Sequence, residues 1–228
     1  MLKNLISDLK KLEDKKQAQL LQGFFKTGKG QYGEGDIFLG IKVPVQRKVA
    51  RNYNDLSLKD IQTLLNSKIH EHRLCALFIL THKYEKTKKK EIVDFYLKNA
   101  KKVNNWDLVD SSAHKILGDY LLDKDKKILY QLANSNNLWE KRISIISTAA
   151  FINKNQFEDT LKISEILLND SHDLIHKAVG WMLREVGKRD QAVEEKFLNK
   201  YHKIMPRTML RYSIEKFDDK KRKFYMRK

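Results

Sequence analysis

The sequence predicts an all-α fold, and three observations lead to that prediction. The chain has 228 residues but only 2 prolines and 9 glycines, so residues that break helices are rare. Apolar residues return every three or four positions instead of alternating, which is the period of an amphipathic helix. No segment has the pattern of a strand, and no long linker interrupts the chain. We therefore expect a protein made of packed helices.

Start signals divide the chain into successive helical segments. Ser57 and Asp60 nearly match a capping box, in which the N-cap residue and the third helical residue satisfy each other's backbone N–H groups. Pro44 and Pro206 each suit the first turn of a helix, where no backbone N–H is needed. Further breaks are expected at Asn54, Asp55, Asp123, Asn153 and Asp170. These signals predict a run of helices of moderate length.

The helical segments also repeat. A cation followed by a small, apolar helix occurs in RLCALFIL from Arg73, RISIISTAAF from Arg142 and KAVGWML from Lys177. The spacings fit a period of about 35 residues, with a middle unit expected near residue 108, in NNWDLVDSSAHKILGDYL. Helix pairs of this period predict an α-solenoid of HEAT-like repeats with a concave basic groove. We expect a single repeat domain over residues 1–218, followed by a basic tail, residues 219–228, that is disordered or contacts DNA.

The charge of the chain restricts its partners. Lys and Arg outnumber Asp and Glu by 46 to 29, which gives a formal net charge of +17 and favours nucleic acid or an anionic surface. No apolar stretch approaches the roughly 20 residues of a membrane span. The first residues resemble an amphipathic helix rather than a signal peptide. The single Cys75 excludes an internal disulfide and fits a reducing cytoplasm, as a buried and inert thiol.

Aromatic and charged residues recur at nearly the spacing of the repeat. Trp106 and Asp110 are an i, i+4 pair and share a helix face. Arg142 follows Asp110 by about one repeat, so the two charges could meet in a structural ion pair or serve a binding groove. In the third unit, Lys177, Trp181, Arg184 and Lys188 form a basic stripe that contains a tryptophan. This stripe is either an ordinary solvated face or a contact for a polyanion that carries flat bases.

Two other patterns give no cofactor or metal site. Gly28, Gly30 and Gly33 satisfy G-x-G-x-x-G, but the preceding strand that a dinucleotide site requires is missing. His70 and His72 point to different faces of a helix, and His82 adds no third ligand. We expect no cofactor and no metal. The glycine-rich segment is a turn or a loop that contacts the DNA backbone.

Several segments together are similar to a known family. FLGIKVPVQR, NNWDLVD, NNLWEKRISI, KAVGWMLREVGK and MPRTMLRYSIEKF closely resemble the AlkD-like DNA alkylation repair proteins, in the correct order, from about residue 20 to residue 218. The resemblance implies a solenoid of HEAT-like repeats and a monofunctional DNA glycosylase for cationic alkylpurines such as 3-methyladenine and 7-methylguanine. It also implies a monomer of bacterial type that acts on alkylated double-stranded DNA in the cytoplasm.

The resemblance implies roles for particular residues. Asp110 matches the catalytic carboxylate, and Trp106 and Trp181 match the aromatic residues of the cleft. The residues expected to contact DNA are Arg47, Arg142 and Arg184, together with Lys177 and Lys188 of the basic stripe. The chain departs from the best-known members at Asn105, where they carry a tryptophan. The alternative function is a non-catalytic HEAT-like module that binds DNA or another protein.

Overall fold

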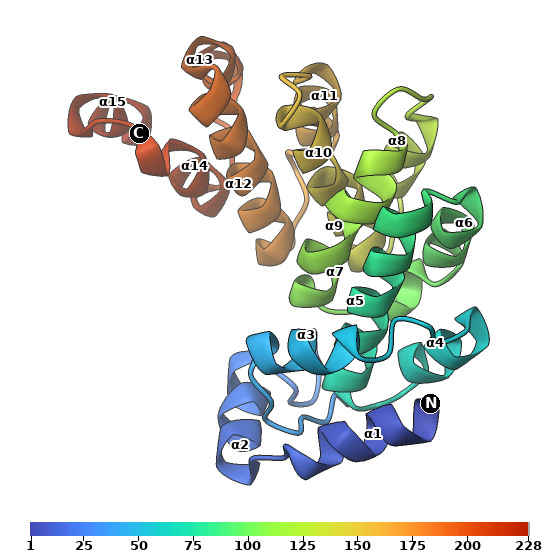
Figure 1. Cartoon of the computed structure of the whole chain (residues 1–228). Coiled ribbons are helices and arrows are strands. Elements are labelled where there is room, and N and C mark those ends of the chain that lie inside the picture. The colour runs from blue at the N-terminus through green and yellow to red at the C-terminus, as the bar shows by residue number, and fades with distance from the viewer. Residues whose placement is uncertain (228) are drawn as a thin grey trace. The chain divides into compact units, whose positions relative to one another are not determined.

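The computed structural model describes residues 1–227, in which helices are joined by turns and irregular segments (Figure 1). Within this range no strand forms, and the one β-type contact is an isolated parallel bridge between Ile37 and Ile69. The predicted all-α class is confirmed. The chain divides into two compact units, of which the first comprises Met1–Ser112 and the second begins at Ala113.

The first unit is organised around α5. Its helices are α1 (Leu2–Lys11), α2 (Lys15–Phe24), α3 (Val43–Arg51), α4 (Leu58–Leu65), α5 (His70–Thr87), α6 (Lys90–Lys98), η1 (Ala100–Lys102) and α7 (Trp106–Ala113), whose last residue opens the second unit. Helices α3, α4 and α6 pack against α5. Every residue from His70 to Thr81 is buried, which a helix surrounded by neighbours on all sides requires.

The second unit is organised around α12. Its helical segments are η2 (His114–Gly118, one π turn), α8 (Lys127–Ala133), α9 (Leu138–Ser147), α10 (Ala149–Ile152), α11 (Glu158–Ile166), α12 (Asp173–Arg189), α13 (Gln191–Tyr201), α14 (Arg207–Ser213), η3 (Ile214–Lys216) and α15 (Asp219–Met226). Helices α9, α11, α13 and α14 all pack against α12. The close approach of α14 depends on Gly180, because a Cβ there would lie 2.4 Å from the carbonyl oxygen of Met209.

The helix boundaries follow the predicted repeat and most of the predicted signals. Helices α5, α7, α9 and α12 begin at residues 70, 106, 138 and 173, so successive starts are 32 to 36 residues apart. Ser57 and Asp60 form a complete capping box, and Pro44 lies in the first turn of α3. Pro206 is the N-cap of α14, one residue earlier than a first-turn position. The sequence therefore encodes the helix ends through local chemistry.

The predicted basic tail is helical as far as it is described. Residues Asp219–Met226 form α15, capped by Asp218, whose carboxylate accepts the backbone N–H of Lys221. The ring of Tyr225 is buried, and its hydroxyl donates to Asn199 of α13 at 3.0 Å. Burial of one aromatic ring anchors this helix, so it packs as an ordered element instead of the disordered end that was one of the two expectations.

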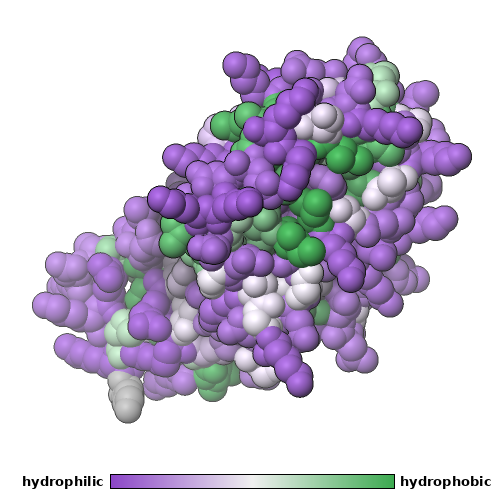
Figure 2. All heavy atoms as spheres, turned by 90° about the horizontal axis from the view of Figure 1, so that it is seen from below, coloured by the Kyte–Doolittle hydropathy of each residue, from purple (hydrophilic) through white to green (hydrophobic). Residues whose placement is uncertain are grey.

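The surface is polar and the interior is apolar. Figure 2 shows one face on which hydrophilic side chains dominate and hydrophobic ones gather in small, separate patches. In residues 1–227 no helix has both the length and the apolar character to cross a membrane. Cys75 is fully buried, and burial together with the charge of Glu71 raises the pKa of its thiol far above the usual range. The expectation of a buried thiol is confirmed.

Candidate active site

Helix α7 carries two of the predicted site residues, Trp106 and Asp110, one turn apart. The side chain of Asn105 caps the helix, because its Oδ1 accepts the backbone N–H of Trp106 at 2.8 Å. Leu108 and Val109, which point to other sides of the helix, are fully buried. Trp106 and Asp110 are only half-buried. This geometry gives an aromatic ring and a carboxylate on one accessible face of a helix.

The indole ring of Trp106 is held by other rings. It stacks on Phe25, with centroids 5.1 Å apart and planes at 11°, and Phe25 stacks on Phe38 at 5.0 Å. Phe38 in turn stacks on the imidazole of His70 at 4.5 Å. The exposed ring of Phe24 meets Trp106 edge-on at 5.9 Å. Aromatic pairs favour both geometries, so these neighbours determine the plane of Trp106.

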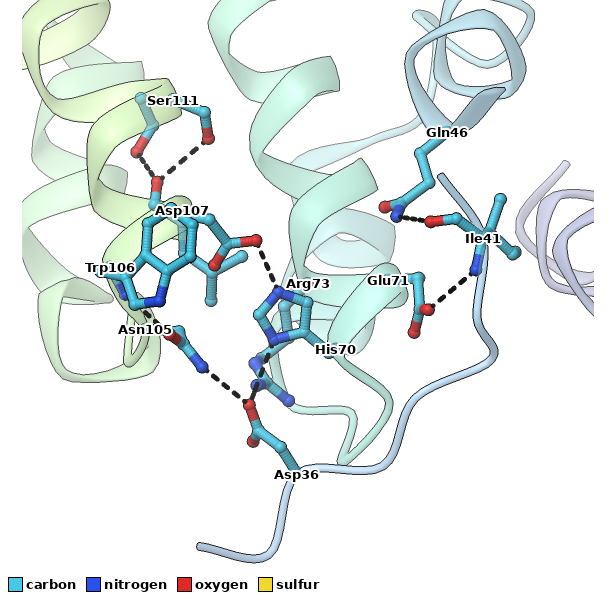
Figure 3. Close-up of polar contacts among 12 residues, drawn as sticks. Asp36, Ile41, Gln46, His70, Glu71, Arg73, Asn105, Trp106, Asp107 and Ser111 are labelled. Atoms are coloured by element: carbon cyan, nitrogen blue, oxygen red, sulfur yellow. Dashed lines mark hydrogen bonds and ion pairs between the residues drawn. The ribbon is translucent and has the colours of Figure 1, made fainter. Parts of the chain in front are cut away.

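His70 lies between two carboxylates (Figure 3). Its Nδ1 is 3.1 Å from Asp36 Oδ2, and its Nε2 is 2.8 Å from Asp107 Oδ2. Burial by itself lowers the pKa of His70, but the charge and hydrogen bond of Asp107 and the hydrogen bond of Asp36 outweigh burial and raise the pKa to about 9. His70 is therefore an imidazolium at neutral pH, and both of its ring nitrogens donate.

The same cluster joins three parts of the first unit. Asp36 lies in the segment between α2 and α3. His70 and Arg73 belong to α5, and Asp107 lies in the first turn of α7. Arg73 donates to Asp36 at 2.6 Å, and Asn105 donates to it at 3.4 Å. Burial opposes ionisation of Asp36, yet His70 and Arg73 hold its pKa below the usual value. A charged, hydrogen-bonded cluster thus supports the start of α7.

A further buried carboxylate, Glu71, shapes the segment that leads into α3. It accepts the backbone N–H groups of Leu39, Gly40 and Ile41 at 2.9, 2.8 and 3.2 Å. Gly40 has a φ of 85°, and a Cβ there would lie 2.1 Å from the carbonyl oxygen of Asp14. Glu71 and Gly40 together fix the path of this segment. A mainly apolar cavity of about 170 Å³ lies beside it, between α2, α3 and α5.

Arg47 belongs to α3 in the first unit. Its guanidinium carbon lies 4.1 Å from the ring centroid of Phe78, in a cation–π contact. The residue is half-buried, so part of it remains exposed beside this contact. The first unit therefore holds Trp106, Asp110 and Arg47 of the predicted residues, and the second unit holds the others.

In the second unit, α12 borders a pocket of about 450 Å³. The pocket is lined by His114, Ile146, Ala149, Ile152, Asn153, Trp181, Met182, Arg184, Glu185 and Lys188. Three predicted residues, Trp181, Arg184 and Lys188, thus line one pocket. Leu174, Ala178, Met182 and Val186 are buried, as expected for the side of α12 opposite the basic stripe.

The cations of this pocket are paired with carboxylates that the sequence did not indicate. Glu185 accepts from Trp181 Nε1 at 3.0 Å and from Lys188 Nζ at 2.7 Å. Arg184 Nε lies 3.6 Å from the same carboxylate oxygen, and Arg184 Nη1 donates to Glu215. A phosphate that approached Arg184 or Lys188 would therefore compete with an internal carboxylate.

The two remaining predicted cations also have internal partners. Lys177 is half-buried and pairs with Asp173, one turn earlier on α12, at 2.7 Å. Arg142, in α9, is 4% exposed, and its Nη1 donates to the carbonyl oxygen of Leu174 at 2.5 Å. This contact joins α9 to the first turn of α12. Arg142 thus has a clear structural role, and its contact with DNA stays a prediction.

Sequence reasoning missed His70 and its two carboxylate partners. It considered His70 only as a metal ligand, and rejected that role. His70 lies 34 residues after Asp36 and 37 before Asp107. These separations are close to the repeat period, so the spacing that indicated Trp106 and Arg142 also marked this cluster.

The fold and these residues define a basic, all-α protein of repeated helix pairs. The family described as DNA alkylation repair enzyme has a model that matches residues 5–217, so the chain belongs to this family. Membership implies DNA as the substrate and confirms the resemblance seen in the sequence. A search of curated proteins finds no match to this chain.

Solved structures show the same fold. A predicted DNA alkylation repair enzyme from Enterococcus faecalis has a TM-score of 0.73 and 16% identity, over 91% of this chain and 97% of that one. AlkD2 from Streptococcus mutans has a TM-score of 0.56 and 19% identity, over 96% and 100%. The protein smu.31 from Streptococcus mutans UA159 has a TM-score of 0.56 and 20% identity, over 78% and 93%. At these identities the likeness concerns the fold alone.

Proposed function

We propose that this protein is a monofunctional DNA glycosylase. It hydrolyses the N-glycosidic bond of cationic alkylated purines, such as 3-methyladenine and 7-methylguanine, in duplex DNA. The observation that carries this proposal is the face of α7, where the half-buried Asp110 lies one turn from Trp106, whose ring is held by stacking on Phe25. The family supports the general role in repair of alkylated DNA.

A single carboxylate is sufficient for this chemistry. A purine alkylated at N3 or N7 already carries a positive charge, so it leaves without a general acid. As the glycosidic bond breaks, positive charge develops on the sugar. A carboxylate held in place stabilises that charge where it appears, and it can orient a water molecule for attack at the sugar carbon. In this mechanism the cationic purine leaves as a neutral base, so Asp110 transfers no proton to it, and the proton of the attacking water passes to solvent.

The aromatic and cationic residues take the remaining roles. Trp106 and Trp181 offer electron-rich faces to the cationic sugar or base. The cations proposed to contact the DNA backbone are Arg47, Arg142, Lys177, Arg184 and Lys188. A net charge of +17 supports binding to a polyanion. Glycosylases generally flip the target base into a pocket; in this proposal the protein holds the backbone around a lesion that departs readily, so stable neutral lesions are not substrates.

The test is release of free base from methylated duplex DNA. Wild-type protein is expected to release 3-methyladenine or 7-methylguanine well above the spontaneous rate, as measured by chromatography of the released bases. Asp110→Asn keeps the size of the side chain but removes its charge. We expect it to lower the single-turnover rate by at least about 100-fold, the usual effect of removing one electrostatic stabiliser, with DNA affinity nearly unchanged.

The matched control is Asp94→Asn on α6. Asp94 is an exposed carboxylate that pairs with Lys90 on its own helix, so this variant should excise like wild type. Absence of base release by the wild-type protein would contradict the glycosylase proposal and favour a non-catalytic DNA-binding module. Normal excision by Asp110→Asn would place the chemistry at another residue.

A further inference from the structure

Trp106, Phe25, Phe38, His70 and Asp107 form a closed circuit of contacts, which we call the His70 circuit. Trp106 stacks on Phe25, Phe25 on Phe38, and Phe38 on His70. His70 Nε2 is bonded to Asp107 at 2.8 Å, and Asp107 is the residue after Trp106. The circuit therefore closes through a single peptide bond, at the first turn of the helix that carries Asp110. Figure 3 shows the bond between His70 and Asp107, with Trp106 beside it.

A closed circuit restrains α7 more strongly than an open chain of contacts. The ring of Trp106 cannot rotate without leaving Phe25, and the first turn of α7 cannot move without breaking the bond between Asp107 and His70. His70 contacts Phe25 directly as well as through Phe38, because the centroids of the His70 and Phe25 rings are 5.0 Å apart. Only 2% of the His70 side chain is exposed, so water does not replace the contacts that the imidazole makes.

Both ring nitrogens of His70 face carboxylate oxygens, Nδ1 that of Asp36 and Nε2 that of Asp107. A neutral imidazole donates from one nitrogen only, so its other nitrogen would face an oxygen to which it cannot donate. Asp36 would keep Arg73 and Asn105 as donors, whereas Asp107 depends on His70. The other oxygen of Asp107 is buried and has no hydrogen-bond partner within the described part of the chain. Loss of the His70 bond would thus leave a largely buried carboxylate with no donor, which is strongly unfavourable. We expect the first turn of α7 to shift in that case.

We propose that His70 is a positioning residue that sets the ring plane of Trp106 and, through the first turn of α7, the location of the Asp110 carboxylate. The catalytic part of this inference rests on the proposed glycosylase function, whereas the positioning part does not. His70 touches neither Asp110 nor the reacting atoms in this assignment. It acts through Asp107 on one side and through the rings of Phe38 and Phe25 on the other.

Several charged groups surround His70. Asp36, from the segment before α3, and Asp107, from α7, bond to its two nitrogens. Arg73 and Glu71 share its helix, and Lys42 borders the cavity next to it. Arg73 and burial favour the neutral ring, whereas the carboxylates favour the charged one and prevail, which raises the pKa of His70 to about 9. Deprotonation of His70 should therefore occur near pH 9, inside the range where the protein can be studied.

The first measurement needs neither DNA nor a substitution at His70. The protein is prepared with 5-fluorotryptophan, and the three ¹⁹F resonances are assigned with Trp106→Phe, Trp139→Phe and Trp181→Phe. We expect the Trp106 resonance to move between pH 6 and 10.5 with a midpoint near 9. The Trp139 and Trp181 resonances should lack this transition. A Trp106 resonance that stays constant over this range would overturn the proposal.

The second measurement uses His70→Gln, with His72→Gln as the matched control. His72 is a buried histidine on the same helix that bonds to Ser67 Oγ at 3.0 Å and takes no part in the circuit. In His70→Gln we expect the pH transition of Trp106 to disappear and the single-turnover excision rate to fall about 10-fold or more, since small misplacements are costly. DNA affinity should change less than about twofold, and His72→Gln should match wild type in both.

The two measurements separate the possible failures. If the Trp106 transition is present but the wild-type protein excises no base, the positioning role stands and the glycosylase proposal fails. If His70→Gln does not fold, the transition in the wild-type protein still tests the role of His70. Unchanged excision by a folded His70→Gln protein would remove His70 from the catalytic assignment, and a transition that persists in this variant would assign the titration to another group.

Discussion

Glu185 and Glu215 hold the cations of the α12 pocket through short contacts with Arg184, Lys188 and the indole of Trp181. Ion pairs at a surface contribute little to stability, so these carboxylates matter more for the availability of the cations than for the fold. A phosphate that approached Arg184 would compete with Glu215 for the guanidinium. We therefore expect the internal carboxylate to weaken binding of a polyanion at this position.

Glu215→Gln should strengthen DNA binding. The substitution removes the charge that competes for Arg184 but leaves the pocket otherwise intact. We expect affinity for undamaged duplex DNA to rise about three- to tenfold at low salt, and the difference to shrink as salt screens the charges. Fluorescence anisotropy over a range of salt concentrations measures this. The control is Glu158→Gln, which removes an exposed carboxylate that pairs with Lys162 on the same helix, α11. Equal DNA affinities of the Glu215→Gln and Glu158→Gln variants would contradict the proposal that Glu215 competes with DNA phosphate for Arg184.

Individual residues were predictable only where their role depended on sequence spacing. Trp106 and Asp110 share a face because four residues make about one helical turn, and the helix formed where expected. The partners of Arg184 and His70 were not predictable. Glu215 and Arg184 are 31 residues apart, and spacing alone does not indicate which of several acidic residues in the next repeat lies within reach.

Two helices can approach closely at a position where one of them has a glycine, because glycine has no side chain. Gly180 on α12 faces Met209 and Tyr212 of α14, and a Cβ would lie 2.4 Å from a carbonyl oxygen and 2.6 Å from the Tyr212 Cβ. Both contacts are shorter than real Cβ atoms allow, and one of them involves backbone. The sequence KAVGWML showed that a small residue stood there, but only the packing of α12 on α14 explains it.

Gly180→Ala should destabilise the protein by about 1 to 3 kcal/mol, because the two helices must move apart. Gly23→Ala is the control. Gly23 also lies in a helix, α2, but nothing lies within 4 Å of a Cβ built there, so alanine should be neutral or stabilise by about 0.5 to 1 kcal/mol. Thermal and urea unfolding followed by circular dichroism measure both variants. A Gly180→Ala protein as stable as wild type would show that α14 adjusts freely.

Each unit of the molecule contains a buried titratable group that should make stability depend on pH. His70, in the first unit, has its pKa raised to about 9 by its carboxylate partners in spite of burial. Glu194, in the second unit, is 1% exposed, and one of its oxygens lacks a partner among the described residues. Burial, with the nearby charge of Glu195, raises its pKa to about 9. Both groups are protonated in the folded protein at neutral pH.

Stability should therefore fall as the pH rises from neutral to about 9. The His70 contribution, on the order of 3 kcal/mol, is complete below its unfolded pKa of about 6.5 and disappears as the pH passes its folded value. Glu194 acts in the same direction, because its unfolded carboxyl ionises from about pH 4.5 while the folded one stays neutral. Urea unfolding at pH 6, 7.5 and 9 measures the decline.

Two variants measure separately how much His70 and Glu194 contribute to the loss of stability between pH 6 and 9. Glu194→Gln keeps a neutral side chain at every pH, so it should gain stability over wild type, on the order of 4 kcal/mol at pH 7.5 and more at pH 9. His70→Gln should lose stability at pH 6 and approach the wild-type value near pH 9.5. If stability does not change between pH 6 and 9, neither group is protonated as described.

The sequence by itself determined the helical class, the repeat period and the helix ends, because these depend on local chemistry and on contacts between residues close in the chain. It also indicated Trp106 and Asp110 as neighbours on one helix face. Only the tertiary structure decided what holds them. The rings of Phe25 and Phe38, the imidazolium of His70 and the carboxylates of Asp36 and Asp107 come together from separate elements. Their interaction depends on burial, which lowers the dielectric and raises the cost of an unpaired charge, and no local pattern in the sequence records that burial.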